Sequence, residues 1–261
     1  MFSVFYIFIA AIIFIFGTAI GSFISATVYR MHKKETMLGR SYCPRCGYKL
    51  GFFDLFPIFS FLYLHGKCRK CKSKIDVEYF LTEIISGAVF VFSFFYRWLN
   101  IDAEEMLVWT ILRDWLFLGG LIFLFIYDFK YRILPDKITF PLISAMLIFN
   151  FFLEENFKDI LIGIAVGAGF FLIQYLISRG KWVGDGDIRM GALLGAALGW
   201  PNVVFALFVA YILGSAATVP LVLMKKKKLK SQIAFGTFLA IGGFTAMYWG
   251  NDIMNWYLSF F

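Results

Sequence analysis

The stretch FSVFYIFIAAIIFIFGTAIGSFISATV, residues 2–28, contains no charged side chain. An α-helix rises about 1.5 Å per residue, so this run is long enough to cross the roughly 30 Å hydrocarbon core of a bilayer. It lacks the charged start of a secretory signal and is longer than the apolar core of such a signal. We therefore expect a first membrane-spanning helix that is retained in the mature protein.

The composition extends this conclusion to the whole chain. Of its 261 residues, 61% are hydrophobic and 16% are charged, and the mean hydropathy is +0.77. These values exclude a soluble globular enzyme, a disordered chain and a disulfide scaffold. Because helices satisfy their own backbone hydrogen bonds in lipid, we expect an all-α, polytopic membrane protein of about eight transmembrane helices. The further spans are expected at 79–98, 106–127, 138–153, 159–178, 189–200, 203–223 and 232–256.

Positive charges gather in every second connection between these spans. Of the 25 Lys and Arg, 22 lie in residues 30–76, 130–137, 179–189 and 225–230, whereas the alternating connections carry mostly acids. Cytoplasmic loops of membrane proteins are enriched in Lys and Arg, so these four segments are expected in the cytoplasm and both termini outside. The orientation of the protein in the membrane and contact with anionic membrane lipids then account for the net charge of +8. The charge gives no reason to expect a nucleic-acid partner.

The loop between the first two spans contains all four cysteines. They form two CxxC pairs separated by 21 residues and are Cys43, Cys46, Cys68 and Cys71. Four thiolates at this spacing can converge on one Zn²⁺, and a closed sphere of four Cys indicates a structural ion. Two disulfides are the alternative, but the charge pattern places the loop in the reducing cytoplasm. His32 and His65 flank the loop and are expected to be ordinary loop residues.

Two acidic segments are expected at one membrane face. The first, YDFKYRILPD at 127–136, leaves the third span, and the second, GDGDIRM at 184–190, opens the sixth. Ionisable groups at such places are costly and indicate function. Two carboxyl groups held close together at low dielectric cannot both ionise easily, so one keeps a proton while the other can draw a proton from water. This pairing suits aspartyl hydrolysis.

Glycines and further acids accompany the two motifs. Gly184 and Gly186 have no side chains, so an extended substrate backbone can approach Asp187 closely. Asp136 and Asp185 are more typical of a helix cap or a salt bridge. Small residues at four-residue spacing, as in Gly163–Gly167 and in Gly191, Gly195 and Gly199, predict closely packed helices.

Several of these features, in this order, resemble the type IV prepilin peptidases, which are bifunctional leader peptidases and N-methyltransferases of bacterial pilus, type II secretion and competence systems. The resemblance covers nearly the whole chain. Its segments are Gly21–Arg30, Cys43–Cys71, Ile75–Glu83, Asp128–Asp136 and Gly184–Trp200. Arg189 and Met190 stand where many relatives have Lys and Leu, which are chemically similar.

The resemblance implies an enzyme of the bacterial inner membrane with Asp128 and Asp187 as its catalytic pair and with Gly184 and Gly186 as active-site support. Such an enzyme cuts the basic leader from a prepilin or pseudopilin at the cytoplasmic face. It then methylates the new N-terminus with S-adenosylmethionine as donor. The implied division is 1–29 as the first transmembrane helix, 30–78 as the cytoplasmic zinc loop and methyltransferase region, and 79–261 as the transmembrane peptidase core.

The residues that would bind the methyl donor are not assigned, because no glycine-rich loop is visible in 30–78. Glu83 matches an acid of the family and is a candidate, although an interhelical hydrogen bond is favoured for it. A leader peptidase without methyltransferase activity is therefore the closest alternative. A noncatalytic membrane scaffold with a zinc docking loop would leave the two aspartate motifs without a role. A transporter would distribute its acids along a path through the bilayer.

Overall fold

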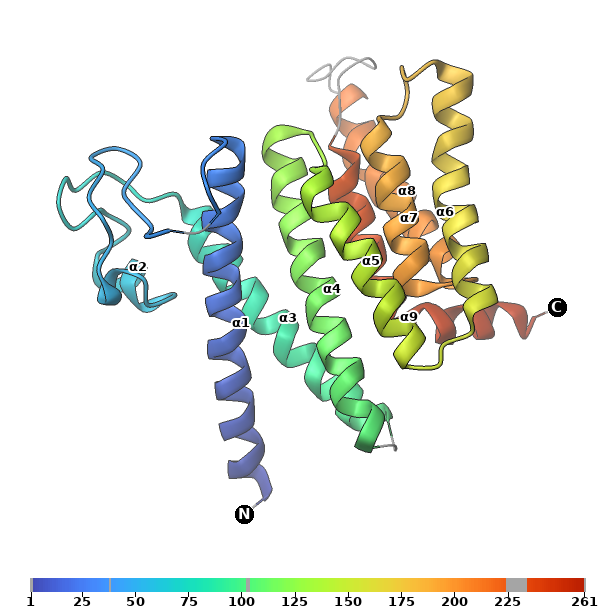
Figure 1. Ribbon diagram of the computed structural model, residues 1–261, viewed down its shortest axis with the longest axis horizontal. Helices are drawn as coiled ribbons and strands as arrows, with labels where there is room; N and C mark the ends of the chain where they lie inside the picture. Colours follow the sequence, from blue (N-terminus) through green and yellow to red (C-terminus); the bar gives the residue numbers. More distant parts are fainter. Residues whose placement is uncertain (1, 38, 102–103, 224–233, 261) are drawn as a thin grey trace. The chain divides into compact units, whose positions relative to one another are not determined.

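The computed structural model describes residues 2–37, 39–101, 104–223 and 234–260. Within these ranges the chain is helical and contains no β-strand, only two isolated bridges, Tyr42 with Lys49 and Lys67 with Lys74 (Figure 1). The expected all-α class is therefore confirmed. The chain divides into two compact units, 1–102 and 103–261, which are described separately.

The first unit is a pair of long helices with the cysteine loop between them. Its elements are α1 (Phe2–His32), η1 (Phe52–Asp54), α2 (Phe59–Tyr63) and α3 (Val77–Asn100). Glycine brings α1 and α3 into close contact, because a Cβ atom on Gly21 would lie 2.8 Å from the Oγ of Ser86. Helix α1 extends past the predicted end of the apolar run at residue 28. There the buried Arg30 donates hydrogen bonds to the carbonyls of Met37 and Gly39, each at 2.9 Å.

The second unit is a helical bundle. Its helices in the described residues are α4 (Glu104–Tyr131), α5 (Asp136–Phe152), α6 (Phe157–Ser178), α7 (Asp185–Leu198), α8 (Asn202–Leu223) and α9 (Phe235–Leu258). The sequence-based spans match these elements in order. The five lysines of 225–230, which contribute to the expected orientation, lie outside the described residues, as does the start of the last expected span at 232.

Within the described residues, five helices are long and apolar enough to cross a membrane, and they are α1, α3, α4, α6 and α8. The expected total of eight spans stays a prediction. Helix α7 has 14 residues, whereas a spanning helix needs about 20. Its position therefore depends on the helices around it.

Helix α7 packs on α6 with backbone touching backbone. A Cβ atom on Gly163 would lie 2.8 Å from the carbonyl oxygen of Gly195, and Gly167 faces the carbonyl of Gly191 at still closer range. Only glycine permits this approach, since any larger residue would push the helices apart. The small-residue faces expected from the sequence are confirmed.

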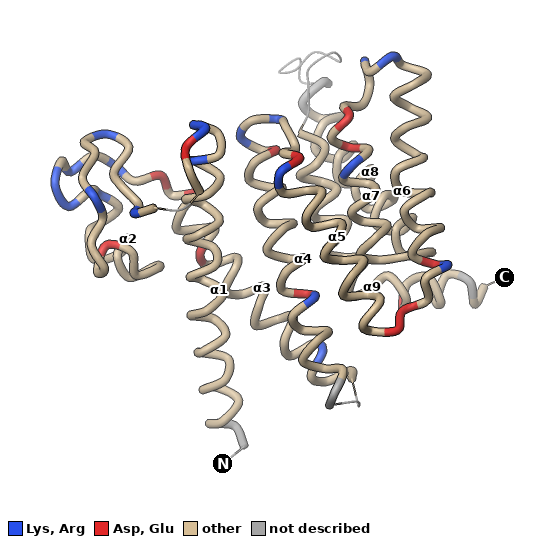
Figure 2. The backbone as a smooth tube through the Cα atoms, viewed as in Figure 1, with Lys and Arg blue, Asp and Glu red and all other residues tan. Residues whose placement is uncertain are grey.

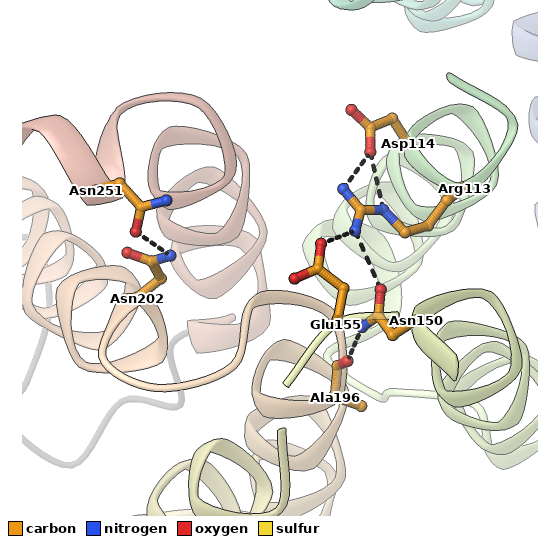
Figure 3. A network of polar contacts seen from close by, with 7 residues as sticks. All are labelled: Arg113, Asp114, Asn150, Glu155, Ala196, Asn202 and Asn251. Atoms are coloured by element: carbon orange, nitrogen blue, oxygen red, sulfur yellow. Dashed lines mark hydrogen bonds and ion pairs between the residues drawn. The ribbon is translucent and has the colours of Figure 1, made fainter. Parts of the chain in front are cut away.

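A polar network connects α4 and α5 to the C-terminal end of α7 (Figure 3). The Arg113 guanidinium of α4 donates to the Asp114 carboxylate at 3.1 Å and to the Asn150 side-chain oxygen at 3.1 Å. Its ion pair with Glu155 measures 3.3 Å. The Asn150 amide in turn donates to the carbonyl of Ala196 in α7 at 2.7 Å. The hydrogen bonds among the buried members, Arg113, Asp114 and Asn150, are strengthened by the low dielectric around them, whereas the Glu155 side chain is half exposed.

We expect Gly167→Ala to destabilise the protein and Gly169→Ala, on the same helix, to leave it as stable as the wild type or slightly more so. A Cβ atom at Gly167 would meet the backbone of Gly191, whereas a Cβ atom at Gly169 meets nothing within 4 Å. Overpacking of this kind costs about 1–3 kcal/mol. The thermal unfolding midpoints of the purified variants in detergent measure the difference, and equal midpoints would contradict the described packing.

Candidate active site

Asp128 lies near the end of α4, and the first turn of α9 holds its carboxylate. The side chain is buried, with 5% of the residue exposed. Its Oδ2 accepts a hydrogen bond from the backbone N–H of Thr237 at 3.1 Å. A Cβ atom on Gly236 would lie only 2.9 Å from the same oxygen. The absent side chain thus lets the N-terminus of α9, with its partial positive charge, approach the carboxylate closely.

Asp187 lies in the first turn of α7, at the third residue of the helix. Its Oδ2 accepts a hydrogen bond from the backbone N–H of Gly184 at 3.2 Å. This contact closes the first turn of the helix in the manner of an N-terminal cap. It also explains why α7 begins at Asp185, four residues before the start of the expected apolar span.

Leu134 connects the neighbourhoods of the two aspartates. This buried side chain lies in the turn between α4 and α5. A Cβ atom on Gly186 would lie 3.1 Å from the Cβ of Leu134, and a Cβ atom on Gly236 would lie 3.2 Å from its Cδ1. The starts of α7 and α9 therefore meet at one side chain, next to Asp128.

The electrostatics of Asp187 reflect this arrangement. Burial raises the pKa of its carboxyl group to about 7, and the carboxylates of Asp128 and Asp185 act in the same direction. The structure thus brings Asp128 close enough to oppose ionisation of Asp187. When two carboxyl groups lie near each other in this way, ionisation of one disfavours ionisation of the other.

Asp136 and Asp185 have a structural partner in common, as expected from the sequence. The Arg189 guanidinium forms ion pairs with Asp136, the first residue of α5, and with Asp185 at 2.7 Å. Both acids are exposed. Exposed ion pairs contribute little to stability, so Arg189 mainly orients the starts of α5 and α7 relative to each other.

Gly236 and Thr237 are absent from the sequence-based set of site residues. The sequence offers only a Gly-Thr pair near the start of the last apolar run, and that signal is common at helix ends. Their role depends on a contact between residues 109 positions apart. No local pattern could have indicated it.

The four cysteines converge within the first unit. Their sulfur atoms all lie within 4.8 Å of one another, and the distances are 3.9 Å between Cys43 and Cys71 and 4.0 Å between Cys46 and Cys68. None is in a disulfide. Metal–sulfur bonds of about 2.3 Å in tetrahedral geometry place sulfur atoms roughly 3.8 Å apart. The donor set therefore fits one metal ion that prefers thiolates.

The two CxxC pairs share one local conformation. Each is followed by a left-handed residue, Gly47 at φ +68° and Lys72 at φ +56°. In each turn a backbone N–H returns to the first cysteine, from Gly47 to the Cys43 carbonyl at 2.9 Å and from Lys72 to the Cys68 carbonyl at 3.0 Å. Both CxxC pairs therefore end in the same tight turn.

Glu83 has a structural partner in the loop. Its Oε2 accepts a hydrogen bond from the backbone N–H of Ile58 at 2.7 Å. The hydrogen bond to another helix that the sequence favours is present as well, because the Ser22 side chain of α1 is a second hydrogen-bond partner of the Glu83 carboxylate.

The fold and the site define a class: a polytopic helical membrane protein with a coupled pair of carboxyl groups and a four-cysteine cluster. Two family models match the chain, the Bacterial Peptidase A24 N-terminal domain at residues 15–97 and the Type IV leader peptidase family at residues 115–219. The chain belongs to the type IV leader peptidase family.

Proteins named prepilin leader peptidase/N-methyltransferase are similar over most of the chain. The one from Aeromonas salmonicida is 27% identical and aligns with 95% of this chain and 94% of its own length. The one from Pseudomonas aeruginosa is 29% identical, with 94% and 91% covered. The one from Stutzerimonas stutzeri is 30% identical, with 85% and 76% covered. No solved structure gives a significant match.

Proposed function

We propose that this chain is an aspartyl endopeptidase of the bacterial inner membrane that removes the basic leader of type IV prepilins or pseudopilins. We further propose that it methylates the new N-terminus with S-adenosylmethionine. Membership of the family and similarity to bifunctional relatives along nearly their whole length support both activities. The observation that carries the peptidase proposal is geometric: the starts of α7 and α9 meet at Leu134, which brings Asp187 of α7 near Asp128, the carboxylate held by α9.

The pair carries out acid–base chemistry on one water molecule. One carboxylate takes a proton from the water as its oxygen attacks the scissile carbonyl, while the protonated partner donates to the carbonyl oxygen. When the tetrahedral intermediate collapses, the proton taken from water goes to the leaving amine. No covalent intermediate forms. The α9 amide that contacts Asp128 and the Gly184 amide that contacts Asp187 hold the two carboxyl groups in place.

The glycines of the second motif support this chemistry. Gly184 supplies the amide that fixes Asp187. Gly186 has Leu134 against its Cα, and it presents no side chain beside Asp187 to obstruct an extended substrate. The basic segments next to both motifs support a cytoplasmic location for this end of the bundle, where a prepilin leader would be exposed.

The cysteine cluster would hold a structural Zn²⁺. Cys43, Cys46, Cys68 and Cys71 supply four thiolates, and such a closed sphere leaves no position for a reactive water. The ion would tie the two CxxC turns together within a loop of about 50 residues that has little other regular structure. The zinc site would then be the rigid part of the loop, residues 30–78, which is the proposed methyltransferase region.

Intact-mass analysis of the products tests both activities at once. The purified protein is incubated with a synthetic prepilin and S-adenosylmethionine, and we expect loss of the leader together with the mass of one methyl group. Loss of the leader alone would leave a peptidase without methyltransferase activity. An unchanged prepilin, with a known relative active in parallel, would contradict the proposal.

In the same assay Asp128→Asn and Asp187→Asn should each abolish cleavage without preventing folding, because an amide can serve neither as the base nor as the acid. Asp136→Asn is the matched control: it removes an exposed partner of Arg189 and should retain activity. An active Asp187→Asn enzyme would refute the assigned pair. If Asp185→Ala were inactive while Asp187→Asn worked, the catalytic acid would be Asp185.

Gly236→Ala should reduce cleavage by at least tenfold while the thermal unfolding midpoint falls only slightly. The added methyl group would lie 2.9 Å from the Asp128 oxygen and would push the carboxylate away from the α9 amides. Gly169→Ala, which adds a methyl group in open space, should have wild-type activity. Full activity of Gly236→Ala would show that the contact with α9 has no part in catalysis.

The purified protein should contain about one zinc per chain, and Cys46→Ser or Cys68→Ser should reduce the zinc content severalfold because each removes a thiolate. Elemental analysis by mass spectrometry measures the content. Ser73→Ala is the control, since its hydroxyl lies 3.1 Å from the Cys71 sulfur but is not a ligand. Unchanged zinc in either serine variant would rule out the four-cysteine site.

A further inference from the structure

A short segment of the cysteine loop exposes a cluster of large apolar side chains. This aromatic segment, Phe52–Tyr63, comprises η1, α2 and the residues between them. Phe52, Phe53, Phe59 and Tyr63 are each between 64% and 78% exposed. The rings contact one another, with centroids 5.8 Å apart for Phe52 and Phe53 and 6.0 Å for Phe56 and Phe59. Continuous apolar surface of this kind in a loop is a sign of an interaction site.

The aromatic segment is fixed to the first turns of α3. The Ile58 amide donates to the Glu83 carboxylate at 2.7 Å. Phe61 stacks on Phe80, with ring centroids 4.9 Å apart. The exposed rings belong to parts of the segment that α3 does not cover. The position of the segment relative to the two long helices of the first unit is thus defined.

The attachment of the aromatic segment to α3 lies at the same height along the helix axes as the uncharged part of α1. Next to Glu83 on α3, Thr82 and Ser86 lie against Gly21 of α1. Gly21 precedes the end of the uncharged run at Val28 by seven residues, or about 10 Å of helix. The aromatic segment therefore lies beside helix surface that is itself expected to be in lipid, and its exposed rings continue that surface.

The backbone of the aromatic segment is suited to such an environment. Groups placed in lipid must satisfy their hydrogen bonds within the protein. The amides of Leu55, Ser60 and Leu62 donate to carbonyls inside the segment, at 3.0–3.1 Å. Pro57 has no N–H, and the Glu83 carboxylate accepts the hydrogen bond from Ile58. The hydrogen bond to Glu83 thus satisfies an amide that would find no water partner in lipid. In a water-exposed loop, water could satisfy the same amide.

The charges of the loop are arranged to match a membrane surface. Figure 2 shows basic residues at several places along the loop outside η1 and α2, and the aromatic segment itself contains no Lys or Arg. The one acid of the aromatic segment, Asp54, has a side chain only 4% exposed and is neutralised by Arg69 at 2.6 Å. An apolar segment without free charge within a cationic loop is the pattern of an interfacial membrane anchor.

We propose that the aromatic segment inserts into the cytoplasmic leaflet of an anionic bilayer, where its rings contact acyl chains and the cationic residues of the loop contact lipid phosphates. The membrane thereby holds the cysteine loop at a fixed depth beside α1 and α3. Other occupants of this surface, such as the apolar helix of a prepilin or a second copy of the chain, are outcomes of the test.

Photo-crosslinking in membranes tests the proposal. Benzoylphenylalanine is placed at Phe53, and in a second variant at Phe59, of the full-length protein in liposomes of phosphatidylethanolamine and phosphatidylglycerol. Lys72, exposed in the same loop but outside the aromatic segment, is the control position. Irradiation followed by intact-mass analysis should give adducts of one phospholipid at Phe53 and Phe59 at least fivefold more often than at Lys72.

Two results would overturn the proposal. One is a lipid adduct no more frequent at Phe53 and Phe59 than at Lys72. The other is a predominant adduct with a second copy of the chain, or with a prepilin added to the same liposomes. Thermal unfolding midpoints equal to that of the wild type show that the labelled variants are folded, and the two independent positions keep the test decisive if one of them is not.

Discussion

The close packing of α7 against α6 is the constraint on which the second unit depends. A helix of 14 residues cannot be positioned by the thickness of the membrane, so its place is set by contacts along its length. Glycine backbones provide these contacts on one face, and the Asn150 amide provides one more near the end of the helix. Asp187, in the first turn of α7, takes its position from both.

The two carboxyl groups are held by the same device, a backbone amide at the start of a helix. The amide of Thr237 in α9 contacts Asp128, and the amide of Gly184 before α7 contacts Asp187. Amides at helix starts are fixed by the helices themselves, so they need no reorganisation when the charge on a carboxyl group changes. The proposed mechanism, in which the two carboxyl groups exchange protons with water and substrate, would gain from such rigid surroundings.

Much of the fold could be predicted from the sequence because hydrophobic runs and cysteine spacing are local patterns. The order of the helices, the convergence of Cys43–Cys71 and the glycine faces follow from such patterns and are confirmed. Two motifs and a family resemblance predict Asp128 and Asp187 as the catalytic pair. The contact of Gly236 with Asp128 and that of Ile58 with Glu83 were not predictable, because each joins segments that have no common pattern and meet only in the folded chain.

The Arg113–Asp114 pair has a consequence for the charge balance of the bundle. Because the two residues are adjacent in sequence, the positive charge of Arg113 has its counterion on α4 itself. A lone arginine costs about 2.5–3.5 kcal/mol at the centre of a membrane-spanning helix. Helix α4 therefore needs no acid from a neighbouring helix to offset this charge. The neutral side chain of Asn150 can then accept from Arg113 and donate to α7, so that α4, α5 and α7 are joined without a further charge in the bundle.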